Sequence, residues 1–254
     1  MRGLLGAFAI AFSMYSRIPV PRVDWTKERM RYALCFFPMI GVVMGAALYG
    51  GMCLAERFFP QGQYPVLYAG IGTAFPLLVT GGIHMDGFLD VTDARSSYGE
   101  KEKKLQILKD PHTGAFAIIG CGVYLLLYAA FFSVLDRKKL ACFAASFVME
   151  RALSGLSVVC FPKAKNTGLA ATFSGQAQKI AVAVCMVLWF LCGSAFLCWQ
   201  SGVGKAAVCI IAALVVYGYY GWMARREFGG ITGDLAGWFL QVCELVFLAA
   251  AAFL

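Results

Sequence analysis

The chain has 254 residues, of which 60% are hydrophobic and 14% are charged. Soluble domains carry about 25% charged residues, and water must wet much of their surface. The composition therefore excludes an ordinary soluble domain and predicts an all-α, polytopic integral membrane protein. The formal net charge of +8 gives no reason to expect a nucleic-acid partner, because membrane topology accounts for the basic residues.

The first apolar run, residues 3–16, is too short to cross a bilayer comfortably. It is expected to form a short helix that lies in the interface, or that enters and leaves on the same side. A membrane crossing needs about 20 mainly apolar residues. Seven runs meet this length and predict transmembrane helices in a single membrane domain over residues 1–254, at about 32–54, 64–82, 113–135, 140–161, 180–200, 206–224 and 236–254.

Alternate loops differ in charge. The segments 17–31, 83–112, 162–179 and 225–226 carry fifteen Lys and Arg residues, against five in the loops between them. Basic loops are retained on the cytoplasmic side of a membrane. We therefore expect these four segments, and any site that they form, to face the cytoplasm.

Three aspartates follow the second apolar run. Asp86, Asp90 and Asp93 stand at i, i+4 and i+7, and a helix places them within about 60° of arc. Carboxylates on one stripe repel one another unless a cation binds there. Oxygen ligands of this kind suit Mg²⁺ or Mn²⁺. The stripe predicts a metal site that Asp110 could complete, and these four acids are the candidate metal ligands and catalytic residues.

Two simpler interpretations of the stripe stay open: a solvated acidic face, and an intramembrane path for protons or cations. The pair Gly81 and Gly82 before the acids, and the polar run after them, favour a site at the membrane edge. His84 lies about 160° from the stripe if the helix includes it, and otherwise precedes the helix. It is a candidate general base, phosphate donor or plain hydrogen-bonding residue.

Further polar candidates fall on the same side of the membrane. Lys109 could contact phosphate as a point charge, and the loop 163–168 is either an anion contact or an orientation signal. Arg225 and Arg226 precede glycines that allow close approach to a ligand, and Asp234 follows them. This convergence on one side predicts a single site.

Charges inside the apolar runs are costly and are usually paired or functional. Glu150 and Arg151 are expected either to form an internal ion pair or to contact a ligand. Glu244, in the last run, is a further pairing partner.

The acidic segment resembles the signature of the cobalamin synthase family, also called adenosylcobinamide-GDP ribazoletransferases, over residues 82–93 (GIHMDGFLDVTD). Ala94 stands where many members have glycine, and Leu108 where they often have methionine. Neither position ligates a metal, so these departures leave the resemblance intact. Other segments match in the same order and extend the resemblance over essentially the whole chain: 17–21 (RIPVP), 37–41 (FPMIG), 109–116 (KDPHTGAF) and 229–234 (GGITGD).

The resemblance implies a Mg²⁺-dependent phosphotransferase that lies in the cytoplasmic (inner) membrane. Its substrates are adenosylcobinamide-GDP and α-ribazole or its 5′-phosphate, and its products are adenosylcobalamin, or the corresponding 5′-phosphate, and GMP. Cleavage of a diphosphate depends mainly on charge neutralisation and positioning. The implied partners are these small molecules and the lipid bilayer, and a homo-oligomer is compatible with them. The residues implied to contact substrates or metal, besides the four acids, are Lys109, His112, Arg225, Arg226, Thr232 and Asp234.

Two other classes of protein place acids at a membrane edge. CDP-alcohol phosphotransferases carry the pattern Asp-Gly-x2-Ala-Arg-x8-Gly-x3-Asp-x3-Asp. Here Ala94 and Arg95 follow Asp93 directly, and Lys103 stands where that pattern requires an acid. A cation-coupled transporter is expected to have inverted hydropathy repeats, and the sequence does not show them.

Overall fold

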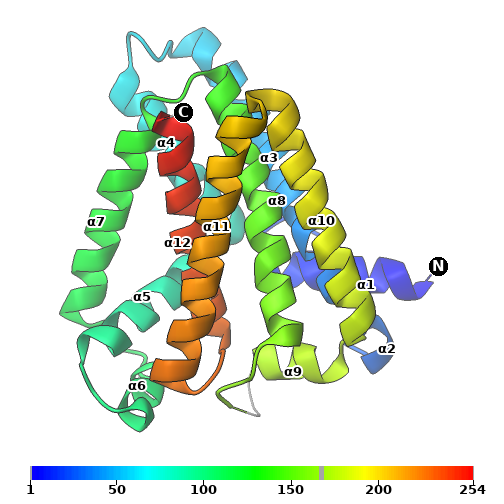
Figure 1. Ribbon diagram of the computed structural model, residues 1–254. Helices are drawn as coiled ribbons and strands as arrows, with labels where there is room; N and C mark the ends of the chain where they lie inside the picture. The colour runs from blue at the N-terminus through cyan, green and yellow to red at the C-terminus, as the bar shows by residue number, and fades with distance from the viewer. Residues whose placement is uncertain (1, 166–168, 254) are drawn as a thin grey trace.

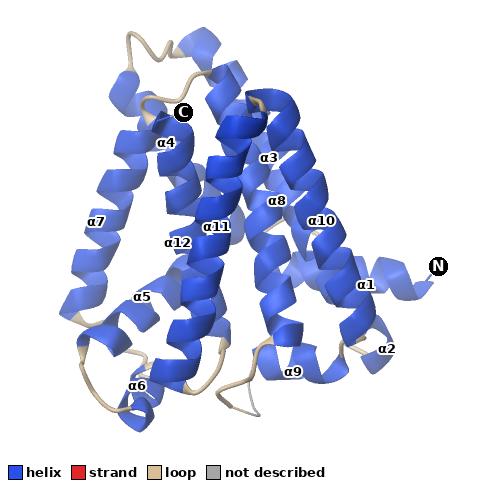
Figure 2. Cartoon of the chain, viewed as in Figure 1, coloured by secondary structure: helices blue, strands red, loops and turns tan. Residues whose placement is uncertain are grey.

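The computed structural model describes residues 2–165 and 169–253, which form a bundle of long helices joined by loops (Figure 1, Figure 2). Over these residues, the one β interaction is an isolated bridge between Lys163 and Ile231. Six of the described helices are long and apolar enough to cross a membrane. A pair of helices joined by a sharp bend gives a seventh span if the pair is counted as one. The predicted all-α polytopic architecture is confirmed.

The long helices follow the predicted apolar runs. Helices suit these runs because every backbone N–H and C=O inside a bilayer must find a partner within the protein. A 3₁₀ turn, η1 (Ala33–Phe36), leads into the first of them, and a π-turn, η2 (Ala224–Phe228), follows the fifth. The six helices are α3 (Phe37–Phe58), α7 (Ala115–Phe132), α8 (Arg137–Cys160), α10 (Lys179–Ser201), α11 (Val203–Met223) and α12 (Gly233–Phe253).

The predicted second crossing is bent sharply at its end. α4 (Pro65–Thr80) and α5 (Ile83–Ser96) meet at an angle of 96°. Gly81 and Gly82 between them have φ angles of 69° and 79°. Glycine adopts this left-handed conformation without the steric penalty of a Cβ atom. The glycine pair therefore turns the acidic helix sideways, across the direction of the long helices (Figure 1).

α8 forms the centre of the bundle. It packs against α3, α10 and α12, and it is the most fully buried of the crossing helices. α7 and α10 instead expose most of their surface, with apolar side chains such as Leu126 and Trp199, which are 74% and 77% exposed. In a chain of this composition such faces are suited to lipid.

Buried charges lie within the crossing helices. Arg151 Nη1 is 2.6 Å from Glu150 Oε1, and both side chains are fully buried in α8. Glu244 of α12 accepts a hydrogen bond of 2.7 Å from the hydroxyl of Tyr128 on α7. Of the two interpretations of Glu150 and Arg151, the structure thus shows an internal ion pair.

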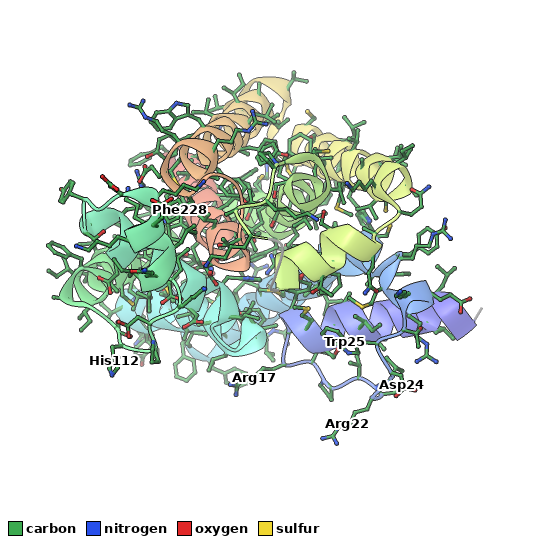
Figure 3. The ribbon with its side chains drawn as sticks, turned by 90° about the horizontal axis from the view of Figure 1, so that it is seen from below. Arg17, Arg22, Asp24, Trp25, His112 and Phe228 are labelled. Atoms are coloured by element: carbon green, nitrogen blue, oxygen red, sulfur yellow. The ribbon has the colours of Figure 1, made fainter. Side chains whose placement is uncertain are left out.

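The predicted basic segments gather at one end of the bundle, which we call the basic end. Three short helices, α2 (Lys27–Met30), α6 (Lys101–Ile107) and α9 (Leu169–Gln176), lie there, whereas α12 ends at the opposite side (Figure 1). Figure 3 looks onto the basic end, where Arg17 and His112 are visible. Each membrane-spanning helix carries the chain from one end of the bundle to the other, so alternate loops meet at the same end. That the basic end faces the cytoplasm stays a prediction.

The N-terminal apolar run forms α1 (Arg2–Tyr15). This helix packs against α2, η1 and α3 and runs across the long helices instead of along them (Figure 1). Its length and course match the short helix expected for residues 3–16, and its depth in the membrane stays a prediction.

Candidate active site at the crossing of α5 and α12

α5 carries the three aspartates of the acidic stripe on one continuous helix. Asp86 is exposed, and Asp90 and Asp93 are half-buried. The helix packs against α12 on one side and α7 on the other. The contact with α12 brings a further carboxylate, Asp234, to Asp90. The contact with α7 gives Asp93 hydrogen-bond partners.

Two glycines let the backbones of α5 and α12 approach closely. A Cβ atom on Gly87 would lie 2.6 Å from the backbone oxygen of Asp234 and 2.9 Å from its Cα. A Cβ atom on Gly237 would lie 3.1 Å from the backbone oxygen of His84. Only glycine permits such a crossing without displacing a helix. The crossing places Asp234, in the first turn of α12, against the acidic stripe.

Four carboxylates share this neighbourhood. The negative charges of Asp86, Asp234 and Asp93 all act on Asp90, and Asp86 also acts on Asp234. The hydroxyl of Thr232 donates a hydrogen bond of 3.3 Å to Asp234 Oδ2 and accepts one of 3.2 Å from the backbone of Leu235. Thr232 therefore orients Asp234, and the predicted assignment of both residues to the site is consistent with their positions.

Asp93 has a structural partner as well. Its carboxylate accepts hydrogen bonds from the backbone N–H groups of Gly114 and of Ala117, the latter at 2.9 Å. These groups begin α7, where the first N–H groups of a helix lack partners within the helix. Asp93 thus caps α7 from a neighbouring helix and fixes the loop that precedes it.

Asp110 lies in the loop between α6 and α7. It is exposed, and it accepts a hydrogen bond of 3.0 Å from the backbone N–H of His112 and lies 2.7 Å from His112 Nδ1. The backbone hydrogen bond and the imidazole hold the pKa of Asp110 below its ordinary value. His112 is also exposed, so the structure pairs these two predicted site residues with each other.

Lys165 brings a positive charge to the acids. Its Nζ donates a hydrogen bond of 3.2 Å to the backbone oxygen of Leu105. Burial and the neighbouring charge of Lys109 lower the pKa of Lys165, and Asp234 acts in the opposite direction. The charges of a second lysine and of a carboxylate at the crossing therefore both act on Lys165. The sequence indicated only a basic loop here, without singling out this residue.

A short backbone interaction places Lys165 there. The backbone N–H of Ile231 donates to the oxygen of Pro162 at 2.8 Å, and that of Ala164 donates to the oxygen of Ile231 at 3.0 Å. A Cβ atom on Gly230 would lie 2.6 Å from the Pro162 oxygen, so glycine is required for this approach. The loop before α12 and the loop after α8 are thereby held together.

Glu227 of η2 links α5 and α6 near the site. It lies 3.2 Å from Arg95 Nη2 at the end of α5 and 2.6 Å from Lys104 Nζ on α6. Arg95 Nη2 also donates to the hydroxyl of Tyr219 at 2.7 Å. Sequence reasoning missed this network, because no local pattern links residues this far apart.

The guanidinium groups of Arg225 and Arg226 lie against aromatic rings, and their predicted contact with substrate phosphates stays a prediction. The Arg225 guanidinium lies 5.7 Å from the ring centroid of Phe161, and that of Arg226 lies 5.3 Å from that of Trp222. Both arginines are exposed beside α11, and no hydrogen bond or ion pair joins either of them to the acids among the described residues.

His84 lies within α5, which begins at Ile83. Its ring is buried, 6.3 Å from those of Tyr15 and Phe37, and its Nε2 atom has no hydrogen-bond partner among the described residues. Of the two placements considered, His84 therefore takes the one in which the helix includes it and carries it away from the stripe. Its role as a base stays a prediction.

The donor atoms at the crossing fit a hard divalent cation. They are carboxylate oxygens that repel one another, which is the chemistry that Mg²⁺ or Mn²⁺ relieves. Among the described residues, no three His, Cys, Asp or Glu side chains converge as a ready-made cage. Mg²⁺ usually binds through one or two carboxylates together with water and substrate phosphates, so such a cage is not required.

The fold and these charges define a multi-pass helical membrane protein with a polar site at one end of its bundle. The chain belongs to the cobalamin-5-phosphate synthase family, whose model matches residues 7–252. This confirms the predicted family and makes the chain a transferase. It gives no support to the CDP-alcohol phosphotransferase or transporter alternatives.

The sequence of this chain aligns with those of its relatives over nearly their full lengths. The chain is 46% identical over 242 residues to an adenosylcobinamide-GDP ribazoletransferase from Lachnoclostridium phytofermentans, covering 95% of this chain and 91% of the relative. Proteins of the same name from Clostridium perfringens strain 13 and Treponema denticola are 30% and 31% identical, covering 94% and 97% of both chains. No solved structure matches the chain.

Proposed function

We propose that the chain joins adenosylcobinamide-GDP to α-ribazole, or to its 5′-phosphate, and releases GMP. The product is adenosylcobalamin or its 5′-phosphate. The names of the relatives and the family support this reaction. The observation that carries it is the close approach of α5 and α12, which brings the negative charges of Asp86, Asp90 and Asp234 together and leaves Asp234 under the positive charge of Lys165. Carboxylates can hold a divalent cation and a lysine can bind phosphate, and a diphosphate donor needs both.

Asp86, Asp90 and Asp234 are the residues at this crossing that would hold Mg²⁺ or Mn²⁺. When bound, the ion neutralises charge on the diphosphate and on the departing GMP. Asp93, whose oxygens already cap α7, and the exposed Asp110 stay predicted ligands. Asp93 acts on Asp90 from the same helix, and Asp110 lies in the loop between α6 and α7.

Lys165 and Lys109 would hold phosphate oxygens of the donor as point charges. A hydroxyl oxygen of the ribazole attacks the cobinamide-linked phosphorus, a new P–O bond forms, and the P–O bond to GMP breaks. The hydroxyl proton passes to an acceptor, for which a carboxylate of the crossing that binds no metal is well placed. The buried His84 is the alternative acceptor if its ring reaches the substrate.

The reaction is proposed to take place on the cytoplasmic side of the inner membrane. The gathering of the basic segments at the same end as the acidic crossing supports this orientation, because basic loops stay in the cytoplasm. Water-soluble substrates would then reach the site without entering the bilayer.

Purified full-length protein in detergent tests the proposal. With adenosylcobinamide-GDP, α-ribazole and MgCl₂, GMP should appear, and omission of α-ribazole or addition of a chelator should stop its release. GMP formed equally without α-ribazole would identify a hydrolase instead. Absence of GMP with every divalent metal would remove the proposed reaction.

A further inference from the structure

The outer face of α11 carries an exposed apolar stripe. Val208, Ile211, Val215 and Trp222 recur at helical spacing and are 49%, 59%, 63% and 50% exposed. Gly218 stands in the series between the last two and is also exposed. In a multi-pass membrane protein such a face is suited to contact with lipid acyl chains. The stripe runs along α11 toward η2 at the basic end.

A groove with a volume of about 520 Å³ opens where the stripe ends, lined by Phe161, Gly218, Gly221, Trp222, Arg225 and Arg226. Apart from the adjoining residues and backbone of α11 itself, no atom lies within 4 Å of the place where a Cβ on Gly218 would stand, so the floor of the groove is open there. The ring of Phe161 lies 2.9 Å from the corresponding position on Gly221 and forms a wall. The groove is thus continuous with the lipid-facing stripe.

The groove carries two positive charges and no carboxylate. Contact with the rings of Phe161 and Trp222 holds both guanidinium groups at its rim. Among the described residues, neither arginine takes part in an ion pair, and Glu227 beside them is already paired with Arg95 and Lys104. The two guanidinium groups at the rim are therefore suited to bind an anion.

We infer that the groove binds an anionic phospholipid, with its phosphate between Arg225 and Arg226 and an acyl chain along Gly218. Guanidinium groups are strong partners of phosphate oxygens, and basic clusters at a membrane surface select anionic headgroups. A soluble phosphate compound would satisfy the arginines but leave the apolar floor empty, which favours a lipid. This site does not depend on the chemistry proposed for the acidic crossing.

Native mass spectrometry of the full-length protein in detergent tests the inference, with phosphatidylglycerol as the anionic probe and phosphatidylcholine as the zwitterionic one. Phosphatidylglycerol should bind more tightly, and the double variant Arg225→Gln/Arg226→Gln should bind it roughly 30-fold more weakly. Lys101→Gln/Lys103→Gln removes the same charge from exposed positions of α6 at the same end. This control should leave the affinity unchanged.

A second variant tests whether the open space at Gly218 is needed for lipid binding, without altering the charge of the groove. Gly218→Leu fills the open space and should weaken phosphatidylglycerol binding, whereas Gly122→Leu, at an equally open position of α7, should not. Equal affinity for the two lipids, or unaltered binding in both groove variants, would overturn the inference. Displacement of phosphatidylglycerol by GMP would overturn it too, because the groove would then be a nucleotide site.

Discussion

Asp234 and Asp93 show how one functional group takes different roles within one site, where both charges act on Asp90. Asp234 faces other carboxylates, whereas Asp93 is bonded to the start of α7. Asp234→Asn should lower GMP release about a hundredfold or more without lowering the midpoint of thermal unfolding, because it relieves repulsion. Asp93→Asn should lower that midpoint, because it weakens a helix cap worth about 1 kcal/mol.

Both variants are measured by GMP release and by thermal unfolding in detergent. Asp24→Asn, an exposed acid at the same end of the bundle, is the control and should change neither quantity. Full activity in Asp234→Asn would remove Asp234 from the site.

Lys165 should make substrate affinity sensitive to alkaline pH. Burial and Lys109 lower the pKa of Lys165, so its ammonium group loses the proton at lower pH than an ordinary lysine. Only the charged form attracts phosphate, and the KM for adenosylcobinamide-GDP should therefore rise as the pH becomes alkaline. Lys165→Arg keeps the charge and should flatten that rise. Identical KM profiles in the two proteins would contradict a phosphate contact at this position.

At the scale of helices, the close crossing of α5 and α12 is the feature on which the site depends. Gly87→Ala places a Cβ atom 2.6 Å from backbone of Asp234, and backbone cannot move aside as a flexible side chain can. The two helices should separate, with loss of GMP release and a lower midpoint of thermal unfolding.

Gly122→Ala is the matched control for Gly87→Ala. It is also a glycine within a helix, but its Cβ position is open. Alanine is favoured over glycine inside a helix by about 1 kcal/mol, so this control should be neutral or slightly stabilising. Equal behaviour of the two variants would show that the crossing tolerates separation.

The elements that the sequence predicts well are those with a strong local signal. Length and apolar composition indicate each transmembrane helix, and the spacing of Asp86, Asp90 and Asp93 indicates that they share one helix face. The cap made by Asp93 and the approach of Lys165 to Asp234 depend on how distant segments cross. The π-turn η2 changes the helical phase, and with it the directions of Arg225 and Arg226, which local spacing cannot predict.

For the whole molecule, the ion pair within α8 lies at the centre of the packing. Arg151→Met leaves Glu150 buried without its partner and should lower the free energy of unfolding by about 3–5 kcal/mol. The double variant Glu150→Gln/Arg151→Met removes both charges and should recover most of that loss. Denaturant unfolding in detergent measures both, and a double variant as unstable as the single one would show that the charges are required for more than mutual compensation.

The sharp bend after α4 has a consequence for the surrounding membrane. α4 has 16 residues and is therefore about 24 Å long, less than the hydrocarbon thickness of about 30 Å. Because the chain turns sideways at Gly81, α4 is not extended by a further helical turn in the same direction, and we expect the bilayer beside α4 to thin to match it. Turnover should accordingly decline in nanodiscs made from phosphatidylcholines with progressively longer acyl chains, so that bilayer thickness itself becomes a control on the enzyme.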